Sequence, residues 1–77
     1  MKLLWYNFDG RMKLLLNGET REFQSELTLQ DLLNHLAIPA GRVACEVILK
    51  IIKRPFYGET RLREGDSVEI IQAIGGG

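Results

Sequence analysis

The chain has 77 residues, which suits one small domain with a modest hydrophobic core. Its hydrophobic share of 45% is too high for an intrinsically disordered chain. Ten basic and ten acidic residues cancel, with both signs mixed in each half, which argues against a protein that binds the backbone of nucleic acids.

Residues 1–11 form a predicted N-terminal extension. Asn7 and Asp9 break its apolar run, which is too short for the hydrophobic region of a signal peptide. No later run approaches the roughly 20 apolar residues of a membrane span, so we expect no membrane association. The extension is expected to cover other residues, with an extra edge strand favoured over a contact with a partner subunit. It holds three of the six aromatic residues: Trp5, Tyr6 and Phe8.

A β-hairpin is predicted over residues 12–24. The apolar run 12–16 leads directly into Asn17-Gly18, two residue types that tolerate the positive φ angles of a tight two-residue turn. Residues 19–24 then return as the second strand, with Phe23 pointing inward.

One helix is predicted to follow the hairpin. Thr28 is a suitable N-cap, and Asp31 places a negative charge in the first turn, where the helix dipole favours it. Pro39 and Gly41 end the segment. Four leucines recur at the spacing of one helical face: Leu29, Leu32, Leu33 and Leu36.

Two β-rich segments come next, at residues 43–47 and 48–52, and Pro55 ends them because proline cannot donate to a sheet. Cys45, the single cysteine, forms no intrachain disulfide. Small secreted domains commonly depend on disulfides, so a cytoplasmic location is expected. The apolar neighbours of Cys45 predict a buried core residue and not a nucleophile.

The last part of the chain is predicted to be an irregular link and a final strand. The link runs from Phe56 to Arg63, residues 63–66 have the composition of a turn, and residues 67–74 form the strand. Alternate residues of the strand share a face: Val68 with Ile70, and Glu69 with Ile71 and Ala73.

This order of elements predicts an α+β fold. A hairpin, a helix and further strands in so short a chain form one mixed sheet of four to five strands, with the helix packed across one face. If the last strand lies centrally, beside the first strand and parallel to it, the fold is a β-grasp. The β-grasp domain is expected to span residues 12–74 and to be followed by a tail at 75–77.

The tail consists of Gly75, Gly76 and Gly77. Without Cβ atoms these residues are expected to form a flexible segment, thin enough to enter a slot that any side chain would block. A terminal carboxylate on Gly77 is a poor electrophile until it is activated. The tail therefore predicts a group on which another enzyme acts, with a frayed chain end as the alternative.

Three segments, in this order and spacing, resemble the ThiS family, the sulfur carrier proteins of thiamine biosynthesis. They are residues 12–19 (MKLLLNGE), 42–47 (RVACEV) and 63–77 (REGDSVEIIQAIGGG). The resemblance covers residues 12–77 and implies a ubiquitin-like β-grasp. The chain departs from the family pattern at Ile48, where many members have asparagine, and in the order Arg54-Pro55. These departures concern partner contacts and the link at 55–63 more than the tail.

The resemblance implies a carrier and not an enzyme. A ThiF-like enzyme would adenylate Gly77 with ATP, and sulfur from a donor such as a cysteine desulfurase would displace AMP and leave a thiocarboxylate. A ThiG-like thiazole synthase would take up the sulfur. Gly76 completes the diglycine motif and Gly75 lengthens the tail. No Gly-x-x-x-x-Gly-Lys loop is present, so no cofactor is expected on this chain and the partner would bind the ATP.

Other functions share parts of this pattern. The small subunit of molybdopterin synthase would use the same tail chemistry, and isopeptide conjugation would share the activation step. A plain β-grasp interaction module would make no use of the tail. Within the carrier hypothesis, an apolar patch beside the tail is the candidate docking surface for partners, with cover by the N-terminal extension as its alternative. The patch residues are Ile71, Ala73 and Ile74.

Four further polar residues are interpreted as solvated. His35 lies off the leucine face of the helix, and one histidine with one cysteine makes no metal site. The charged residues near the final strand are interpreted in the same way, although they would also suit the rim of a docking patch: Arg61, Arg63 and Glu69.

Overall fold

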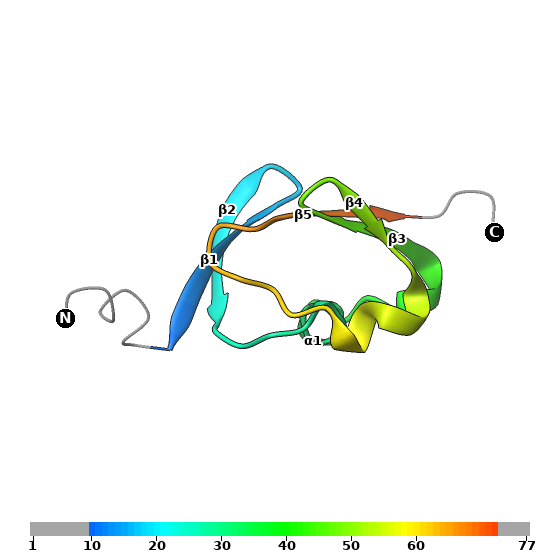
Figure 1. Ribbon diagram of the computed structural model, residues 1–77, viewed down its shortest axis with the longest axis horizontal. Coiled ribbons are helices and arrows are strands. Elements are labelled where there is room, and N and C mark those ends of the chain that lie inside the picture. Colours follow the sequence, from blue (N-terminus) through cyan, green and yellow to red (C-terminus); the bar gives the residue numbers. More distant parts are fainter. Residues whose placement is uncertain (1–9, 73–77) are drawn as a thin grey trace.

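The computed structural model describes residues 10–72, which form one mixed sheet arched over a helix (Figure 1). The strands are β1 Arg11–Leu16, β2 Glu19–Gln24, β3 Val43–Val47, β4 Lys50–Ile52 and β5 Ser67–Gln72. The helices are α1 Leu29–His35 and the short 3₁₀ helices η2 Ala40–Arg42 and η3 Arg54–Glu59. An extra edge strand was predicted within residues 1–11. Residues 1–9 lie outside the described residues, and Arg11 is the first residue of β1.

The sheet has the strand order β2-β1-β5-β3-β4, so the last strand is the central one. β5 runs parallel to β1, with Leu15 opposite Ser67, and antiparallel to β3, with Cys45 opposite Ile70. The predicted β-grasp arrangement is therefore confirmed. The predicted end of the last strand, at residue 74, lies outside the described residues.

The β1–β2 hairpin forms as its sequence predicts. Asn17 and Gly18 have φ angles of 48° and 86°, which match a tight turn with two left-handed residues. Strand alternation sends Leu14 into the core, where it is 1% exposed, and sends its neighbour Leu15 to the opposite face, where it is 39% exposed. Phe23 is buried opposite Met12, as expected.

The helix begins with a complete capping box. The Thr28 hydroxyl accepts a hydrogen bond from the Asp31 N–H at 3.0 Å, and the Asp31 carboxylate accepts one from the Thr28 N–H at 3.0 Å. Two of the N–H groups that a helix N-terminus leaves unpaired are satisfied in this way. The leucine face is buried against the sheet, where Leu29, Leu32 and Leu33 have no exposed surface.

The link after β4 is more ordered than the sequence suggested. Residues Arg54–Glu59 form η3, with a proline in its first turn, where its missing N–H costs nothing. Tyr57 and Leu62 are both buried, and the Leu62 N–H donates to the Leu27 carbonyl at 2.9 Å. The irregular link is confirmed for residues 60–63, whereas residues 56–59 belong to η3, which the sequence did not predict because short 3₁₀ helices give no clear hydrophobic period.

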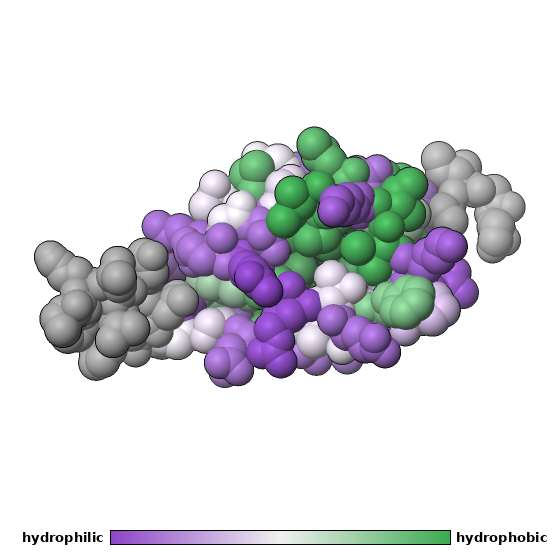
Figure 2. Space-filling view, viewed as in Figure 1, coloured by the Kyte–Doolittle hydropathy of each residue, from purple (hydrophilic) through white to green (hydrophobic). Residues whose placement is uncertain are grey.

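The turn between β3 and β4 places two bulky apolar residues in backbone conformations with a positive φ angle. Ile48 and Leu49 have φ angles of 51° and 64°, and they are 56% and 83% exposed. A β-branched residue is a rare occupant of this left-handed region because its Cβ crowds the backbone. Hydrophobic surface gathers around this hairpin (Figure 2).

Replacing Ile48 with asparagine should stabilise the protein by about 1 kcal/mol, because asparagine adopts a positive φ at low cost. Urea denaturation should show a higher transition midpoint for Ile48→Asn with an unchanged slope. Ile51→Asn is the control, since it removes another mostly exposed isoleucine, 73% exposed, from extended backbone and should bring no gain. Equal effects of the two substitutions would contradict strain at residue 48.

Candidate functional site

The candidate site is the end of β5, from which the glycine tail continues. β5 pairs with β3 along five residue pairs, and Val68, the second residue of β5, has no exposed surface. Gln72 is the last described residue of the strand. The segment that leads into the tail therefore starts from the middle of the sheet and not from an edge.

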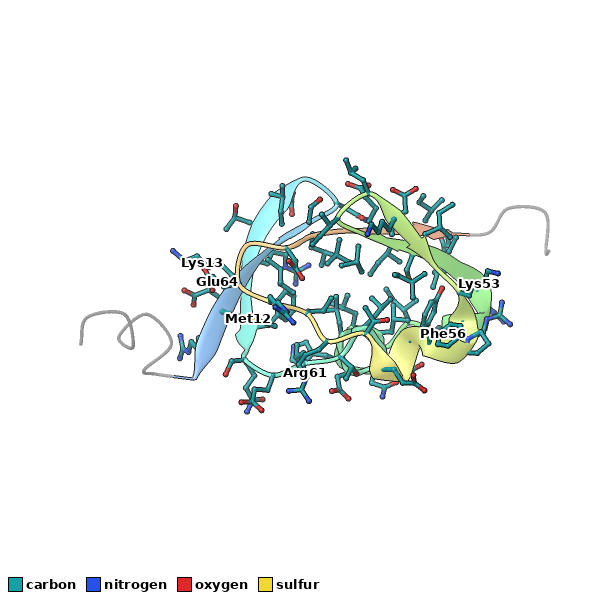
Figure 3. The ribbon with its side chains drawn as sticks, in the orientation of Figure 1. Met12, Lys13, Lys53, Phe56, Arg61 and Glu64 are labelled. Atoms are coloured by element: carbon teal, nitrogen blue, oxygen red, sulfur yellow. The ribbon has the colours of Figure 1, made fainter. Side chains whose placement is uncertain are left out.

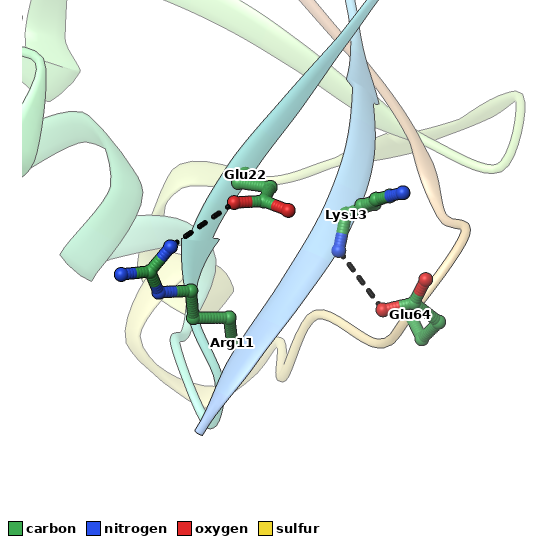
Figure 4. A network of polar contacts seen from close by, with 4 residues as sticks. All are labelled: Arg11, Lys13, Glu22 and Glu64. Atoms are coloured by element: carbon green, nitrogen blue, oxygen red, sulfur yellow. Dashed lines mark hydrogen bonds and ion pairs between the residues drawn. The ribbon is translucent and has the colours of Figure 1, made fainter. Parts of the chain in front are cut away.

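The turn that precedes β5 is bonded to β1 at several points. The Asp66 carboxylate accepts a hydrogen bond from the Arg63 N–H at 2.9 Å, and the Gly65 N–H donates to the Lys13 carbonyl at 2.8 Å. The Glu64 side chain accepts from the Lys13 N–H at 2.9 Å (Figure 4). Gly65 has a φ of 85°, which explains the glycine at this position. This predicted turn sets where β5 begins.

An ion pair appears in the same view. The Arg11 guanidinium lies 3.4 Å from the Glu22 carboxylate, across the β1–β2 ladder (Figure 4). Both side chains are about half exposed or more, so solvent and salt screen the pair and its contribution to stability is small.

Asn17 is hydrogen-bonded to β5 near the C-terminal end of that strand. The Asn-Gly turn signal in the sequence did not reveal this role. The backbone N–H of Asn17 donates to the Val68 carbonyl at 2.9 Å. Its side-chain oxygen accepts from the Ile70 N–H at 2.7 Å, and its side-chain amide donates to the Ile70 carbonyl at 3.3 Å. The side chain thus continues the β1–β5 ladder past the end of β1. Asn17 fixes the position of the strand two residues before Gln72.

A groove of about 530 Å³ opens beside this strand end on the helix side of the sheet. Gln72 lines it, so the segment after β5 begins at the edge of the groove. Its apolar lining comes from four elements or their flanks: Leu16, Leu36, Ile38, Val43 and Ile70. Its other polar lining residues are Asn17, Glu19 and Arg21.

The structure describes only part of the predicted site. Ile71 is 51% exposed and points away from the helix, while Val68 is buried and Ile70 packs against the core, as strand alternation predicted. Its role in docking stays a prediction. The remaining predicted site residues lie outside the described part of the chain: Ala73, Ile74, Gly75, Gly76 and Gly77.

Cys45 is a buried core residue, as predicted, with no exposed surface. Burial raises the pKa of its thiol, and its hydrogen bond with Tyr57 offsets this only in part. Burial, and then the interaction with Cys45, raise the pKa of Tyr57 to about 12. A protonated thiol without solvent access is a poor nucleophile, so Cys45 does not suit a sulfur relay.

Of the predicted solvated residues, His35 and Arg61 lie away from the end of β5, whereas Glu69 lies on β5 and is half-buried. His35 is exposed on the helix, with its ring edge against Phe23 at 5.7 Å between centroids. Arg61 lies on the helix side, next to Thr28, and pairs with Glu26 at 3.6 Å (Figure 3). Within residues 10–72, no three His, Cys, Asp or Glu side chains are grouped closely enough to hold a metal ion. No helix in that range is long and apolar enough to cross a membrane.

A central strand parallel to the first strand, with one α-helix beneath the sheet within residues 10–72, defines a ubiquitin-like β-grasp fold. A model of the ThiS family matches residues 14–77. The chain belongs to the ThiS family.

A solved structure agrees with this membership, and a curated protein is similar over most of its length. The crystal structure of the thiamine biosynthesis protein ThiS from Geobacter metallireducens superposes with a TM-score of 0.76 at 29% identity, covering 86% of this chain and 100% of that one. The uncharacterized protein ycf40 of Porphyra purpurea is 33% identical over 66 residues, which is 86% of this chain and 93% of that protein.

A thiazole synthase from Paramagnetospirillum magneticum also contains a similar segment. It is 39% identical over 66 residues, which cover 86% of this chain. The chain spans only 20% of the length of that relative, so the similarity concerns one segment of a much longer protein.

Proposed function

We propose that this protein carries sulfur for thiamine biosynthesis, as a thiocarboxylate on Gly77. The observation that carries the proposal is the ThiS family match over residues 14–77, which includes the three final glycines. The described body suits this role because β5 holds the start of the tail in the centre of the sheet. Residues 73–77 give a maximum extended reach of ~17 Å beyond Gln72.

The proposed chemistry needs an activation step. A ThiF-like enzyme joins the Gly77 carboxylate to AMP, with release of pyrophosphate from ATP, because a carboxylate oxygen is a poor leaving group and AMP is a good one. A persulfide from a donor such as a cysteine desulfurase then attacks the carbonyl carbon and displaces AMP. A second thiol cleaves the resulting acyl disulfide, leaving the thiocarboxylate on Gly77 and a disulfide on the donor side.

The proposed recipient of the sulfur is a thiazole synthase. Similarity to a segment of a protein named thiazole synthase supports this recipient over molybdopterin synthase. In this scheme the protein is a carrier on which partner enzymes act, and these enzymes bind the ATP. The proposed location is the cytoplasm.

An intact-mass experiment tests the proposal. The full chain is incubated with ATP, its candidate adenylating enzyme and a sulfur donor, and the expected product carries one sulfur in place of one oxygen. Peptide mapping must place the change in the last peptide, because methionine oxidation adds nearly the same mass. No exchange in the presence of an adenylating enzyme that is active on another ThiS protein would refute the proposal.

A further inference from the structure

The central strand β5 has a neighbouring strand along only part of one side. On the β1 side the pairing ends where Leu16, the last residue of β1, lies opposite Val68, and the chain then turns into β2. On the other side β3 continues to pair with β5 as far as Gln72, which lies opposite Val43. The end of β5 is therefore flanked by a strand on one side only.

The side chain of Asn17 takes the place of the missing strand. The Ile70 N–H donates to Oδ1 of Asn17 at 2.7 Å, and Nδ2 of Asn17 donates to the Ile70 carbonyl at 3.3 Å. A carboxamide carries an acceptor and a donor on one planar group, as a peptide unit does. It therefore satisfies both backbone groups of Ile70 and bonds the strand end on the side where β1 is absent.

The turn alone does not require asparagine at position 17. The φ angle of Asn17 is 48°, and asparagine, aspartate and glycine are all common in two-residue turns of this kind. Glycine has no side chain, and an ionised aspartate is an acceptor without a donor. Of these three residue types, only asparagine can bond both the N–H and the carbonyl of Ile70.

The place of these hydrogen bonds on β5 connects them with the proposed function. Ile70 lies two residues before Gln72, from which the chain continues to the glycines. A strand end that is bonded on one side only opens more readily than one bonded on both sides. Misplacement of a reacting group by about 1 Å can cost roughly 10²-fold in rate, so a more open strand end should slow the reaction of the tail.

We propose that Asn17 is a positioning residue for sulfur loading. By bonding Ile70, it fixes the direction in which β5 leaves the folded body, so that the chain enters the adenylating enzyme in one orientation. Asn17 acts through the backbone of Ile70 and not on the reacting atoms. This inference rests on the proposed carrier function and adds to it a residue of the hairpin turn.

Asn17→Gly tests the role because it removes the side chain and keeps a residue that suits the turn. Hydrogen exchange of the Ile70 amide, followed by nuclear magnetic resonance, should become about tenfold faster, whether or not the chain is loaded. The loading rate at saturating carrier should fall about tenfold, and the carrier concentration that gives the half-maximal rate should change less than about twofold. A merely structural role would not give this split, since both variants are folded well below the unfolding transition.

Asn17→Asp provides a conservative rescue. It keeps the acceptor of the shorter bond, so the Ile70 amide should stay protected and loading should remain within about threefold of the unmodified rate. Glu26→Gly is the matched control, since it places glycine at another exposed position with a positive φ, 63°, and removes only an exposed ion pair with Arg61. It should change neither the Ile70 exchange nor the loading rate.

The outcomes separate the inference from the carrier function. Loading of Asn17→Gly at the unmodified rate would overturn the positioning role and leave the carrier function intact. Unchanged exchange of the Ile70 amide in that variant would also overturn it, as would slow loading of Asn17→Asp with a protected Ile70. If the unmodified chain is not loaded by an active adenylating enzyme, the proposed function fails and this inference fails with it.

Discussion

Gly76→Ala should lower the rate of sulfur loading by roughly 10²-fold, because a Cβ next to the reacting carboxylate displaces it from its aligned position in the adenylating enzyme. The loss should appear in the rate and not in the stability of the protein, since residue 76 follows the described fold. The rate is measured as thiocarboxylate formation against time, by mass spectrometry of the intact chain.

Gly58→Ala is the matched control for this experiment. Gly58 lies in η3, has no positive φ, and a Cβ built there meets no atom within 4 Å. The control should load at the unmodified rate. Equal rates for the Gly76 and Gly58 variants would contradict a narrow slot around the tail, even if the carrier function itself holds.

Leu14→Ala should destabilise the protein by about 2–5 kcal/mol, because it leaves a cavity at a fully packed position. Leu14 is 1% exposed, in the middle of the strand that pairs with both β2 and β5. Total stabilities of small domains are about 5–15 kcal/mol, so this loss is a large share. Urea denaturation followed by circular dichroism measures it.

The adjacent substitution Leu15→Ala provides the control. It removes the same atoms from the next residue, which points to the opposite face of the sheet and is 39% exposed. Leu15→Ala should lower the free energy of unfolding by less than about 1 kcal/mol, because Leu15 is only partly buried. A larger loss at Leu15 than at Leu14 would mean that the register of β1 is shifted by one residue, which would exchange the two faces of the strand.

Local signals in the sequence were sufficient for most of the fold. Asn17-Gly18 predicted the hairpin, and the leucine spacing after Thr28 predicted the helix, because both depend on neighbours in the chain. The first part of the link, which forms η3, was missed because Tyr57 is buried by tertiary contacts that leave no periodic pattern. The capping role of Thr28 was foreseen, but the reciprocal bond from Asp31 became visible only in the structure.

The candidate site was less predictable from the sequence than the fold was. The faces of β5 followed from alternation, and the exposure of Ile71 agrees with it. The hydrogen bonds between the Asn17 side chain and the Ile70 backbone join residues 53 positions apart, so no local pattern could reveal them. The roles of Gly75, Gly76 and Gly77 remain predictions.

The central position of β5 has a mechanical consequence. In the proposed function, a partner that draws the tail into its active site would pull along the axis of β5, which is flanked by β1 and β3 on its two sides. Force along a strand acts on its lateral hydrogen bonds in shear, so several must fail together before the strand slides. An edge strand such as β4 would have only one row of bonds to resist the same pull. If the tail is delivered to an enzyme as proposed, this arrangement would let the body of the protein resist the pull without unfolding from that end.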